Sequence, residues 1–527
     1  MCGILFTNSI VNEDDFSKRM NKMHSRGPDS TKCIYNKNFT MGQCLLSFRN
    51  LEEGKKMPYE FIAQNGGKWY LASNAEIYNQ KLIRNDIRYH WYTYQTKEND
   101  GEVIFPVMCA HGFNGPRELD GQFSYVLTNG DTYYIARDPY GITSLYYGFD
   151  LNNNIWVSSE MKCIYDVVSE VLHVPPGHVL HNQCGEFIAY KYNIQPWMNK
   201  YFTYNPKTEA IYEVLKKAVK KRLQSDSEVG LYLSGGLDSS IVAAIAQEHT
   251  SYQMKSFSVG FSKDSPDLIN ARNVAKHIGT NHHELVITEK YAIGLLPEVI
   301  NAIETFDVTT VRASVPMYAL AKYMHSNGVR CALSGEGSDE IFGGYLYFHN
   351  TSNQLHFHKE CVRLLDNIHM FDCLRAHKSS LASSVEVRVP FLDKNFVNYI
   401  MNMNPAYKCC SGDEIEKKIL RQSIPIGMLP DDILWRQKEQ FSDGVGYSWI
   451  DSLKEYCNSY KVNDNDVSSE LNSEEKCYKD IFNSQFMVNG EYAPLRWKRI
   501  TNRWKPSWSI TSDPSGRVQH SHNKYLN

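Results

Sequence analysis

A glycine- and serine-rich turn lies near the middle of the 527-residue chain. Val229–Leu233 is apolar and short enough for a buried strand, Ser234-Gly235-Gly236 interrupts it, and helix-compatible residues continue from Ser239. Glycines let backbone N–H groups approach an anion, and a helix N-terminus favours negative charge. The turn therefore predicts a phosphate site, with an ordinary capped turn as the alternative. Because Asp238 inside the turn would repel bare phosphate, we expect a divalent cation such as Mg²⁺ to bridge them.

A second turn of the same kind follows the apolar run that ends at Leu333. It carries Glu336 and Asp339, which we interpret as metal ligands or proton handlers, with a solvated helix start as the alternative. Further on, Lys438 stands between Arg436 and a glutamate, where a lysine is ordinarily a surface charge. It gains a chemical role if a phosphate group leaves nearby, because the leaving group then needs a cation.

A cysteine occupies position 2. If Met1 is removed, Cys2 carries a thiol beside an α-amine, whose pKa of about 7.7–8 lets it accept the thiol proton. Cys2 would then be a nucleophile with its own base. The alternative is a buried, inert cysteine.

Composition excludes several classes of protein. The formal charge is −3, and the chain has no long basic tract, which argues against a nucleic-acid partner. The 13 cysteines form no CxxC pair, so neither a zinc ribbon nor a secreted disulfide scaffold is indicated. No apolar run approaches the roughly 18 residues that span a bilayer. We therefore expect a cytoplasmic protein that binds neither membrane nor nucleic acid.

The pattern of predicted elements divides the chain in two, as its length also suggests. Alternating apolar residues in 69–72, 123–127 and 132–136 predict a β-rich layered unit. After residue 210 strands and helices alternate, which predicts a doubly wound parallel sheet with ligands at the carboxyl ends of its strands. The fold class is α/β throughout. Turn-rich residues near 202–207 give the domains 2–203 and 204–527, the second with a polar C-terminal tail.

The N-terminal half resembles the class II glutamine amidotransferases. The resemblance rests on Cys2 together with RGPD (26–29), NAEIYN (74–79), DGEVI (100–104) and RDPYG (137–141). It implies an αββα sandwich in which Cys2 attacks the side-chain amide of glutamine and Asn74 helps to form the oxyanion hole. The residues that it implies for glutamine binding are Asn74, Ala75, Glu76 and Asp100. For Asn74 and Asp100 the alternative is a turn residue beside a predicted strand end.

Five positions depart from the pattern of that family. Leu45 stands where an arginine normally holds the α-carboxylate of glutamine, Ser25 replaces a histidine, Ala75 replaces a glycine, and Glu98-Asn99 replace Gly-Ser. A lost charge-assisted contact is worth about 1.5–3 kcal/mol. An ammonia-dependent enzyme with a degenerate glutaminase domain is therefore the alternative to a glutamine-dependent one.

The C-terminal half resembles the PP-loop ATP pyrophosphatases through SGGLDSS (234–240), and the whole chain resembles the glutamine-hydrolysing asparagine synthetases. The further strings are ETFDVTTVRAS, SGEGSDEIFGGYLYFH, EVRVPFLD and RQKEQFSDGVGYSW. This implies a carbon–nitrogen ligase that forms β-aspartyl-AMP and pyrophosphate from aspartate and ATP, and then asparagine with ammonia. A lactam-closing relative and a tRNA-modifying PP-loop protein are the rival interpretations.

The resemblance also assigns roles to single residues. Thr309 and Arg312 belong to the reacting centre, Glu336 serves adenylate formation or ammonia attack, and Lys438 contacts pyrophosphate. We expect Asp238 and Asp339 to hold Mg²⁺, and a homodimer is one candidate oligomeric state. The implied ATP contacts are Leu233, Ser234, Gly235, Gly236, Leu237, Asp238, Ser239, Ser240, Val259, Ser334 and Gly335.

Overall fold

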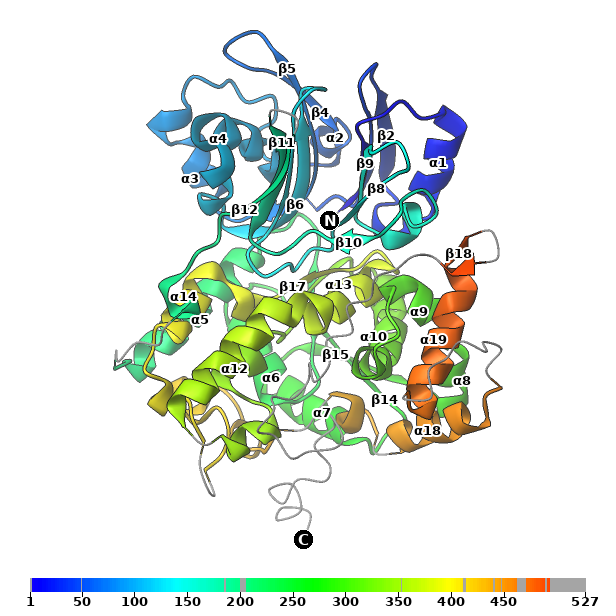
Figure 1. Cartoon of the computed structure of the whole chain (residues 1–527). Coiled ribbons are helices and arrows are strands. Elements are labelled where there is room, and N and C mark those ends of the chain that lie inside the picture. Colours follow the sequence, from blue (N-terminus) through cyan, green and yellow to red (C-terminus); the bar gives the residue numbers. More distant parts are fainter. Residues whose placement is uncertain are drawn as a thin grey trace.

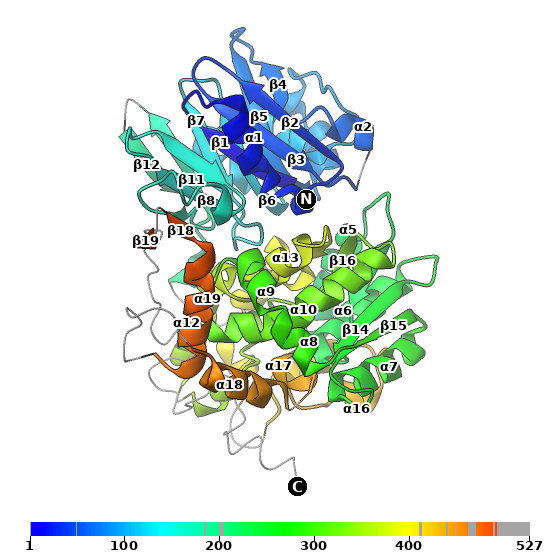
Figure 2. The same ribbon diagram turned by 90° about the vertical axis from the view of Figure 1, so that its right-hand side faces the viewer.

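The computed structural model describes residues 2–48, 50–183, 186–199, 205–351, 353–410, 414–438, 441–446, 448–461, 471–488 and 491–492. These residues form two units, which lie one above the other in Figure 1 and remain stacked in the view turned by 90° (Figure 2). The predicted boundary between residues 203 and 204, and the predicted polar tail, lie outside the described residues.

Two antiparallel sheets packed face to face build the N-terminal unit. Successive side chains of β1 (Cys2–Thr7) point to opposite faces of the first sheet. Ile4 and Phe6 join the cluster between the two sheets, whereas Leu5 points to the other side, toward Phe16 and Met20 of α1 (Glu13–Asn21). The outer face of the second sheet is covered by α3 (Gln80–Arg84), η3 (Asp100–Val103) and α4 (Ile104–His111). This is the αββα arrangement that the motifs implied. In spatial order the strands are β10 (Leu172–His173), β8 (Tyr146–Phe149), β9 (Ile155–Ser158), β1 (Cys2–Thr7), β3 (Thr40–Leu45) and β2 (Ser30–Tyr35) in one sheet, and β12 (Glu186–Lys191), β11 (His178–Gln183), β7 (Tyr133–Arg137), β6 (Gly121–Thr128), β5 (Lys68–Ile77) and β4 (Tyr59–Ile62) in the other.

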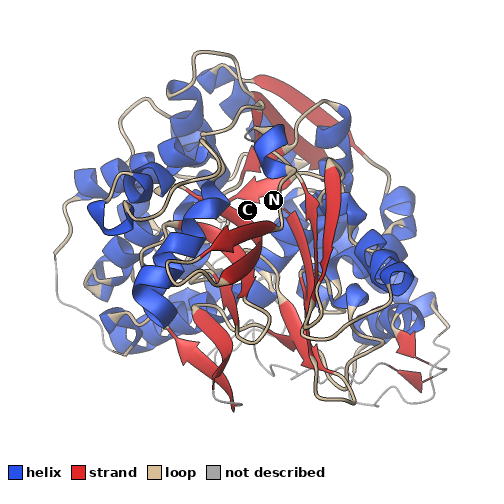
Figure 3. Cartoon of the chain, turned by 90° about the horizontal axis from the view of Figure 1, so that it is seen from above, coloured by secondary structure: helices blue, strands red, loops and turns tan. Residues whose placement is uncertain are grey.

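The C-terminal unit is built on a parallel sheet with the strand order β15-β14-β13-β16-β17. Helices α5, α6 and α7 pack against one another, as do α9, α10 and α13, so helices cover both faces of a doubly wound sheet. Figure 3 shows the whole chain from above, from the side of the N-terminal unit, with strands near the centre and helices around them. The strands are β13 (Val229–Tyr232), β14 (Lys255–Gly260), β15 (Asn281–Val286), β16 (Cys331–Leu333) and β17 (Glu386–Arg388), and the main helices are α5 (Thr208–Arg222), α6 (Leu237–Glu248), α7 (Pro266–Ile278), α8 (Glu289–Gly294), α9 (Leu296–Ile303), α10 (Val308–Ser326), α11 (Ser338–Phe342), α12 (Gln354–Asn367), α13 (Asp372–Leu381), α14 (Lys394–Met401), α15 (Lys418–Ser423), α18 (Trp449–Ser459) and α19 (Ser473–Gln485).

The strand order reverses between β14 and β16, on either side of β13. Ligands bind at such a switch point, outside the carboxyl ends of the strands. Both glycine-rich turns leave the sheet at this place, one after β13 and the other after β16. The fold therefore brings together two turns that lie about a hundred residues apart in the sequence.

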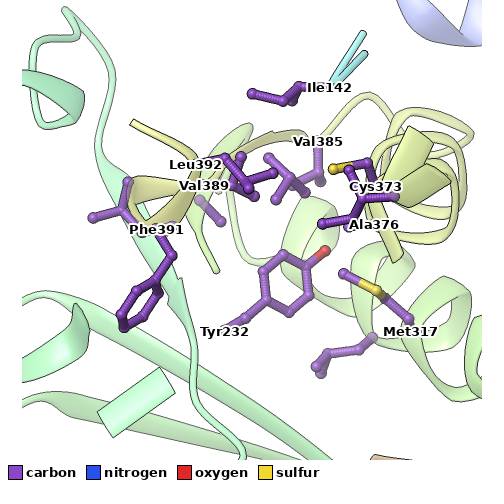
Figure 4. Packing of buried hydrophobic residues seen from close by; sticks show 14 of the residues in the cluster. Ile142, Tyr232, Met317, Cys373, Ala376, Val385, Val389, Phe391 and Leu392 are labelled. Atoms are coloured by element: carbon purple, nitrogen blue, oxygen red, sulfur yellow. The ribbon is translucent and has the colours of Figure 1, made fainter. Parts of the chain in front are cut away.

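The two units share a buried interface that combines apolar and charged contacts. One apolar cluster includes Ile142 of the N-terminal unit and Val385 and Cys373 of the C-terminal unit. In Figure 4, Ile142 lies at one end of this packing and Tyr232 and Met317 lie at the other. The ion pairs that cross the interface include Arg330–Asp29, Lys378–Glu160 and Arg388–Glu76, with N–O distances of 2.7 Å, 2.9 Å and 2.9 Å.

Candidate active sites

The two glycine-rich turns line one cavity in the C-terminal unit. They touch, because a Cβ added to Gly335 would lie 2.8 Å from the backbone nitrogen of Ser239. Gly235 has a φ of +73°, and a Cβ there would lie 2.4 Å from the nitrogen of Ala271 on α7. Since α6 begins at Leu237, the N–H groups of its first turn have no partner within the helix and form a site for an anion.

Two carboxylates and two ammonium groups meet in this cavity. The Nζ of Lys417 lies 2.7 Å from Asp238 Oδ2 and 2.6 Å from Asp339 Oδ1, and the Nζ of Lys438 lies 2.7 Å from Asp339 Oδ2. Burial alone would raise the pKa of Asp339, but Lys417 and Lys438 outweigh it and hold that pKa well below its usual range. Burial lowers the pKa of Lys438, and Asp339 and Asp238 more than reverse this, so its pKa is raised. Asp339 and Lys438 are therefore charged at neutral pH.

The acidic pair also fits a hydrated divalent cation. Asp238 and Asp339 both contact one ammonium, so their oxygens are close enough to share a cation, and Mg²⁺ in nucleotide sites commonly takes one or two carboxylates beside substrate phosphates. Within the described residues, no group of three or more His, Cys, Asp or Glu side chains could hold a metal ion. The two carboxylates would thus need phosphate oxygens to complete the coordination.

Glu336 faces the same cavity from the second turn. Its Oε2 accepts a hydrogen bond of 2.7 Å from Arg375 Nη2 on α13. Burial raises the pKa of Glu336, and Arg375 reduces this rise without cancelling it. A carboxyl group with a raised pKa beside a phosphate site is suited to handling a proton.

Thr309 and Arg312 line the cavity from the first turns of α10. Asp307 caps this helix and accepts a hydrogen bond of 2.7 Å from Thr309 Oγ1. Arg312 Nε donates to Glu474 Oε1 at 2.9 Å, which ties α10 to α19. Both side chains are thus held in place by carboxylate groups outside the two turns.

Most of the residues implied for ATP contact line the cavity, but Gly235 and Ser240 are not among its lining residues. Because Gly235 has no side chain, the first turn can lie close to α7 at this position. Ser240 is buried, and its Oγ donates a hydrogen bond of 2.7 Å to the carbonyl of Gly236. The lining residues that sequence reasoning implied are Leu233, Ser234, Gly236, Leu237, Asp238, Ser239, Val259, Thr309, Arg312, Ser334, Gly335, Glu336, Asp339 and Lys438.

Sequence reasoning missed Lys417 and Arg375, which both line the cavity. Lys417 is followed by a second lysine, a pattern typical of an exposed helix, and Arg375 lies in an ordinary amphipathic helix. No local signal distinguishes them, because Glu336 lies 39 residues from Arg375 and Asp238 lies 179 residues from Lys417. The nearby partner of Arg375, Asp372, is an ordinary neighbour on the same helix.

A second site surrounds Cys2 in the N-terminal unit. The backbone nitrogen of Cys2 donates to Asn74 Oδ1 at 2.9 Å. The Nδ2 of Asn74 is buried and has no hydrogen-bond partner among the described residues, so it is an available donor beside the thiol. Asn74 lies inside β5 opposite Ser124, so its interpretation as a turn residue at a strand end is wrong. An inward-facing amide in this position can stabilise an oxyanion.

The other residues implied for glutamine binding lie close by. Ala75 and Glu76 follow Asn74 in β5, and Asp100 Oδ2 accepts a hydrogen bond of 2.5 Å from the nitrogen of Ile77, the last residue of that strand. Leu45 is buried in β3, directly opposite Cys2 in the sheet. Burial raises the pKa of its neighbour Cys44 to about 12, so that thiol stays protonated.

Arg26, from the RGPD string, connects Cys2 to the C-terminal unit. Its Nε donates to the carbonyl of Cys2 at 3.3 Å, its Nη1 lies 2.5 Å from Glu160 Oε1, and its Nη2 lies 2.9 Å from His377 Nε2 on α13. The site around Cys2 is thus built at the interface, and it faces the unit that holds the cavity.

Helices long and apolar enough to cross a bilayer do not occur in the described part of the chain.

Comparisons with known proteins agree with both sites. Residues 1–193 match the glutamine amidotransferase domain family, and residues 210–356 and 349–504 match asparagine synthase. A probable glutamine-hydrolyzing asparagine synthetase of Dictyostelium discoideum is 39% identical over 99% of both chains. Asparagine synthetase 2 of Arabidopsis thaliana is 38% identical over 98% of this chain and 94% of its own. With such matches over both units, the chain belongs to the asparagine synthase family, in its glutamine-hydrolysing form with an N-terminal glutamine amidotransferase domain.

Proposed function

We propose that this chain makes L-asparagine from L-aspartate, with ATP as co-substrate and glutamine as nitrogen donor. The β-carboxylate of aspartate attacks the α-phosphorus of ATP, the bond from that phosphorus to the bridging oxygen breaks, and pyrophosphate leaves. Ammonia then attacks the acyl carbon of β-aspartyl-AMP and AMP departs. The observation that carries this proposal is the meeting of both glycine-rich turns with Asp339, Lys417 and Lys438 in one cavity.

The residues of the cavity divide this work. The backbone N–H groups of the first turn bind phosphate oxygens, and Ser334 and Gly335 approach the nucleotide from the second turn. Lys438 neutralises the charge that grows on departing pyrophosphate, and Lys417 holds the two carboxylates together. Thr309 and Arg312 orient aspartate. Catalysis then consists mainly of positioning and charge neutralisation.

We propose that Asp238 and Asp339 hold Mg²⁺ when ATP is bound. The cation supplies neutralisation of the triphosphate charge and a fixed geometry for the leaving pyrophosphate. Lys417 contacts both carboxylates, so it would share them with the cation.

In the N-terminal unit, we propose that Cys2 with a free α-amine attacks the side-chain amide of glutamine. A thioester forms, ammonia leaves, and water later releases glutamate. The Nδ2 of Asn74 stabilises the oxyanion, and Glu76 and Asp100 contact the substrate. The ammonia passes to the cavity along the apolar packing between Ile142 and Tyr232, which is supported by the presence of Tyr232 and Met317 in both the packing and the cavity wall (Figure 4).

The domain limits 2–203 and 204–527 also remain a proposal, supported by family matches that end at residue 193 and begin at residue 210. A cytoplasmic location and a homodimer are predictions of the sequence and its resemblance.

Full-length protein supplied with Mg-ATP and aspartate is expected to release pyrophosphate and asparagine in equal amounts, with either glutamine or ammonium as donor. Asparagine is measured by chromatography and pyrophosphate by a coupled assay, with glutamate in place of aspartate as the control. Absence of aspartate-dependent pyrophosphate would contradict the proposal. Turnover with ammonium but not with glutamine would instead favour the degenerate glutaminase domain.

Replacement of Arg375 by methionine is expected to shift the acid limb of the ammonium-dependent pH profile to higher pH. The guanidinium lowers the pKa of Glu336, so its removal raises that pKa further, and the carboxylate form is lost at a higher pH as the solution is acidified. The measurement is kcat/KM for aspartate against pH. Arg272→Met, which breaks an exposed ion pair with Glu284, is the matched control. If the acid limb of Arg375→Met stays at the pH of the parent enzyme or moves to lower pH, Glu336 is not the titrating group.

A further inference from the structure

Strand β17 is in contact with both active sites. It forms one edge of the parallel sheet, and only one of its own edges pairs with β16. On that side the carbonyl of Arg388 accepts a hydrogen bond of 3.0 Å from the nitrogen of Ser334, the first residue of the second turn of the cavity. On the opposite side the carbonyl of Val387 accepts a bond of 3.1 Å from Gln122 Nε2 of the N-terminal unit. The glutaminase unit therefore covers the free edge of the synthetase sheet.

The side chain of Arg388 reaches into the N-terminal unit at the site around Cys2. Its Nη2 lies 2.9 Å from Glu76 Oε2, and its guanidinium lies 5.8 Å from the ring centre of Phe48. Glu76 pairs across β5 and β6 with Gln122, the residue that contacts Val387. Arg388 and Gln122 thus approach the Glu76 region together, two residues along β5 from Asn74.

Contacts within its own unit hold the guanidinium in one orientation. Its Nη1 donates to the carbonyls of Arg222 at 2.8 Å and Gln224 at 2.7 Å, and its Nε donates to Glu386 Oε1 at 2.7 Å. Arg388 has no exposed surface, and Glu76 is 4% exposed. The guanidinium therefore places a fixed positive charge 2.9 Å from Glu76 Oε2, and this ion pair favours one position of the carboxylate.

We propose that Arg388 is a positioning residue of the glutaminase site, which acts from the synthetase unit by orienting the Glu76 carboxylate toward bound glutamine. This inference rests on the proposed function of Glu76. Arg388 touches no substrate itself. It gives glutamine binding a dependence on the correct docking of the two units, because the group that orients the glutaminase carboxylate belongs to the other unit.

The test compares steady-state constants of full-length Arg388→Met, Arg388→Lys and the parent enzyme with glutamine and with ammonium. In Arg388→Met we expect KM for glutamine to rise at least about 10-fold, the size of a lost charge-assisted contact, with ammonium-dependent kcat within about threefold. Arg388→Lys keeps the positive charge but loses the planar guanidinium group. It is therefore expected to retain part of the glutamine affinity that Arg388→Met loses. Arg330→Met is the matched control, because it breaks another arginine–carboxylate pair across the interface, with Asp29.

Equal glutamine KM values in the parent and both Arg388 variants would overturn the proposal, as would a parallel fall of glutamine- and ammonium-dependent rates. If Arg388→Met does not fold, Arg388→Lys decides alone: an unchanged KM for glutamine would overturn the proposal. A rise of the same size in Arg330→Met would show that docking in general, and not Arg388, sets the affinity. Failure of the parent enzyme to form asparagine from ammonium would instead refute the proposed function.

Discussion

Replacement of Cys2 by alanine is expected to abolish asparagine formation from glutamine, with a loss of at least about 10³-fold, because a nucleophile cannot be replaced by positioning alone. Formation from ammonium is expected to stay within about twofold, since the adenylating cavity lies in the other unit and distant sites act independently. The measurement is the initial rate of asparagine formation with each donor. Accumulation of a covalent adduct with a glutamine analogue, seen by mass spectrometry, is expected in the parent enzyme only.

Cys44→Ala is the matched control for this variant. Cys44 is buried beside Cys2 and its thiol pKa is raised to about 12, so it stays protonated and cannot substitute as the nucleophile. Equal glutamine-dependent rates in Cys2→Ala and the parent enzyme would remove Cys2 from the mechanism. A loss of both activities in Cys2→Ala would mean that the variant disturbs the interface as well as the thiol.

Replacement of Lys438 by methionine is expected to lower the rate with both nitrogen donors by about 10²- to 10³-fold, the usual cost of removing one group that stabilises developing charge. The ammonium lies 2.7 Å from Asp339 Oδ2 in the cavity, and without it one cation fewer faces the departing pyrophosphate. The most direct measurement is the aspartate-dependent exchange of labelled pyrophosphate into ATP, because this reports adenylation without the ammonia step.

Lys418→Met provides the control, because Lys418 is half-exposed and pairs with Glu414 on the surface. It is expected to leave the exchange rate unchanged. Thermal unfolding of both variants separates a catalytic loss from a loss of fold. An exchange rate in Lys438→Met within about threefold of the parent would contradict the assignment of charge neutralisation to this lysine.

Local patterns in the sequence were enough to predict the elements that carry the phosphate site. Val229–Leu233 was expected as a strand and forms β13, which ends one residue earlier, and the helix expected from Ser239 begins at Leu237. Such elements follow from hydrophobic period and turn residues, which act over a few positions. The doubly wound sheet, which the alternation of strands and helices predicts, is confirmed, and so is the αββα sandwich, which the family resemblance implies.

Contacts between distant segments could not be predicted in this way. Lys417 and Arg375 owe their positions in the cavity to helix packing, and Arg388 owes its role to the docking of the two units. Asn74 was considered as a turn residue because an asparagine beside apolar alternation is typical of turns, yet its strand continues through it to Ile77. A polar residue inside a buried strand is a useful signal of function, because burying a polar group that lacks a hydrogen-bond partner costs free energy.

The covered edge of β17 has a consequence for the separability of the two halves. If the C-terminal half were produced alone, the strand edge would be open to solvent, and Arg388 and Lys378 would lose Glu76 and Glu160. Each of these cations keeps a carboxylate of its own unit, Glu386 for Arg388 and Glu304 for Lys378, so the open strand edge is the larger change. An open strand edge invites pairing with other copies, and the C-terminal half alone is therefore expected to self-associate through β17.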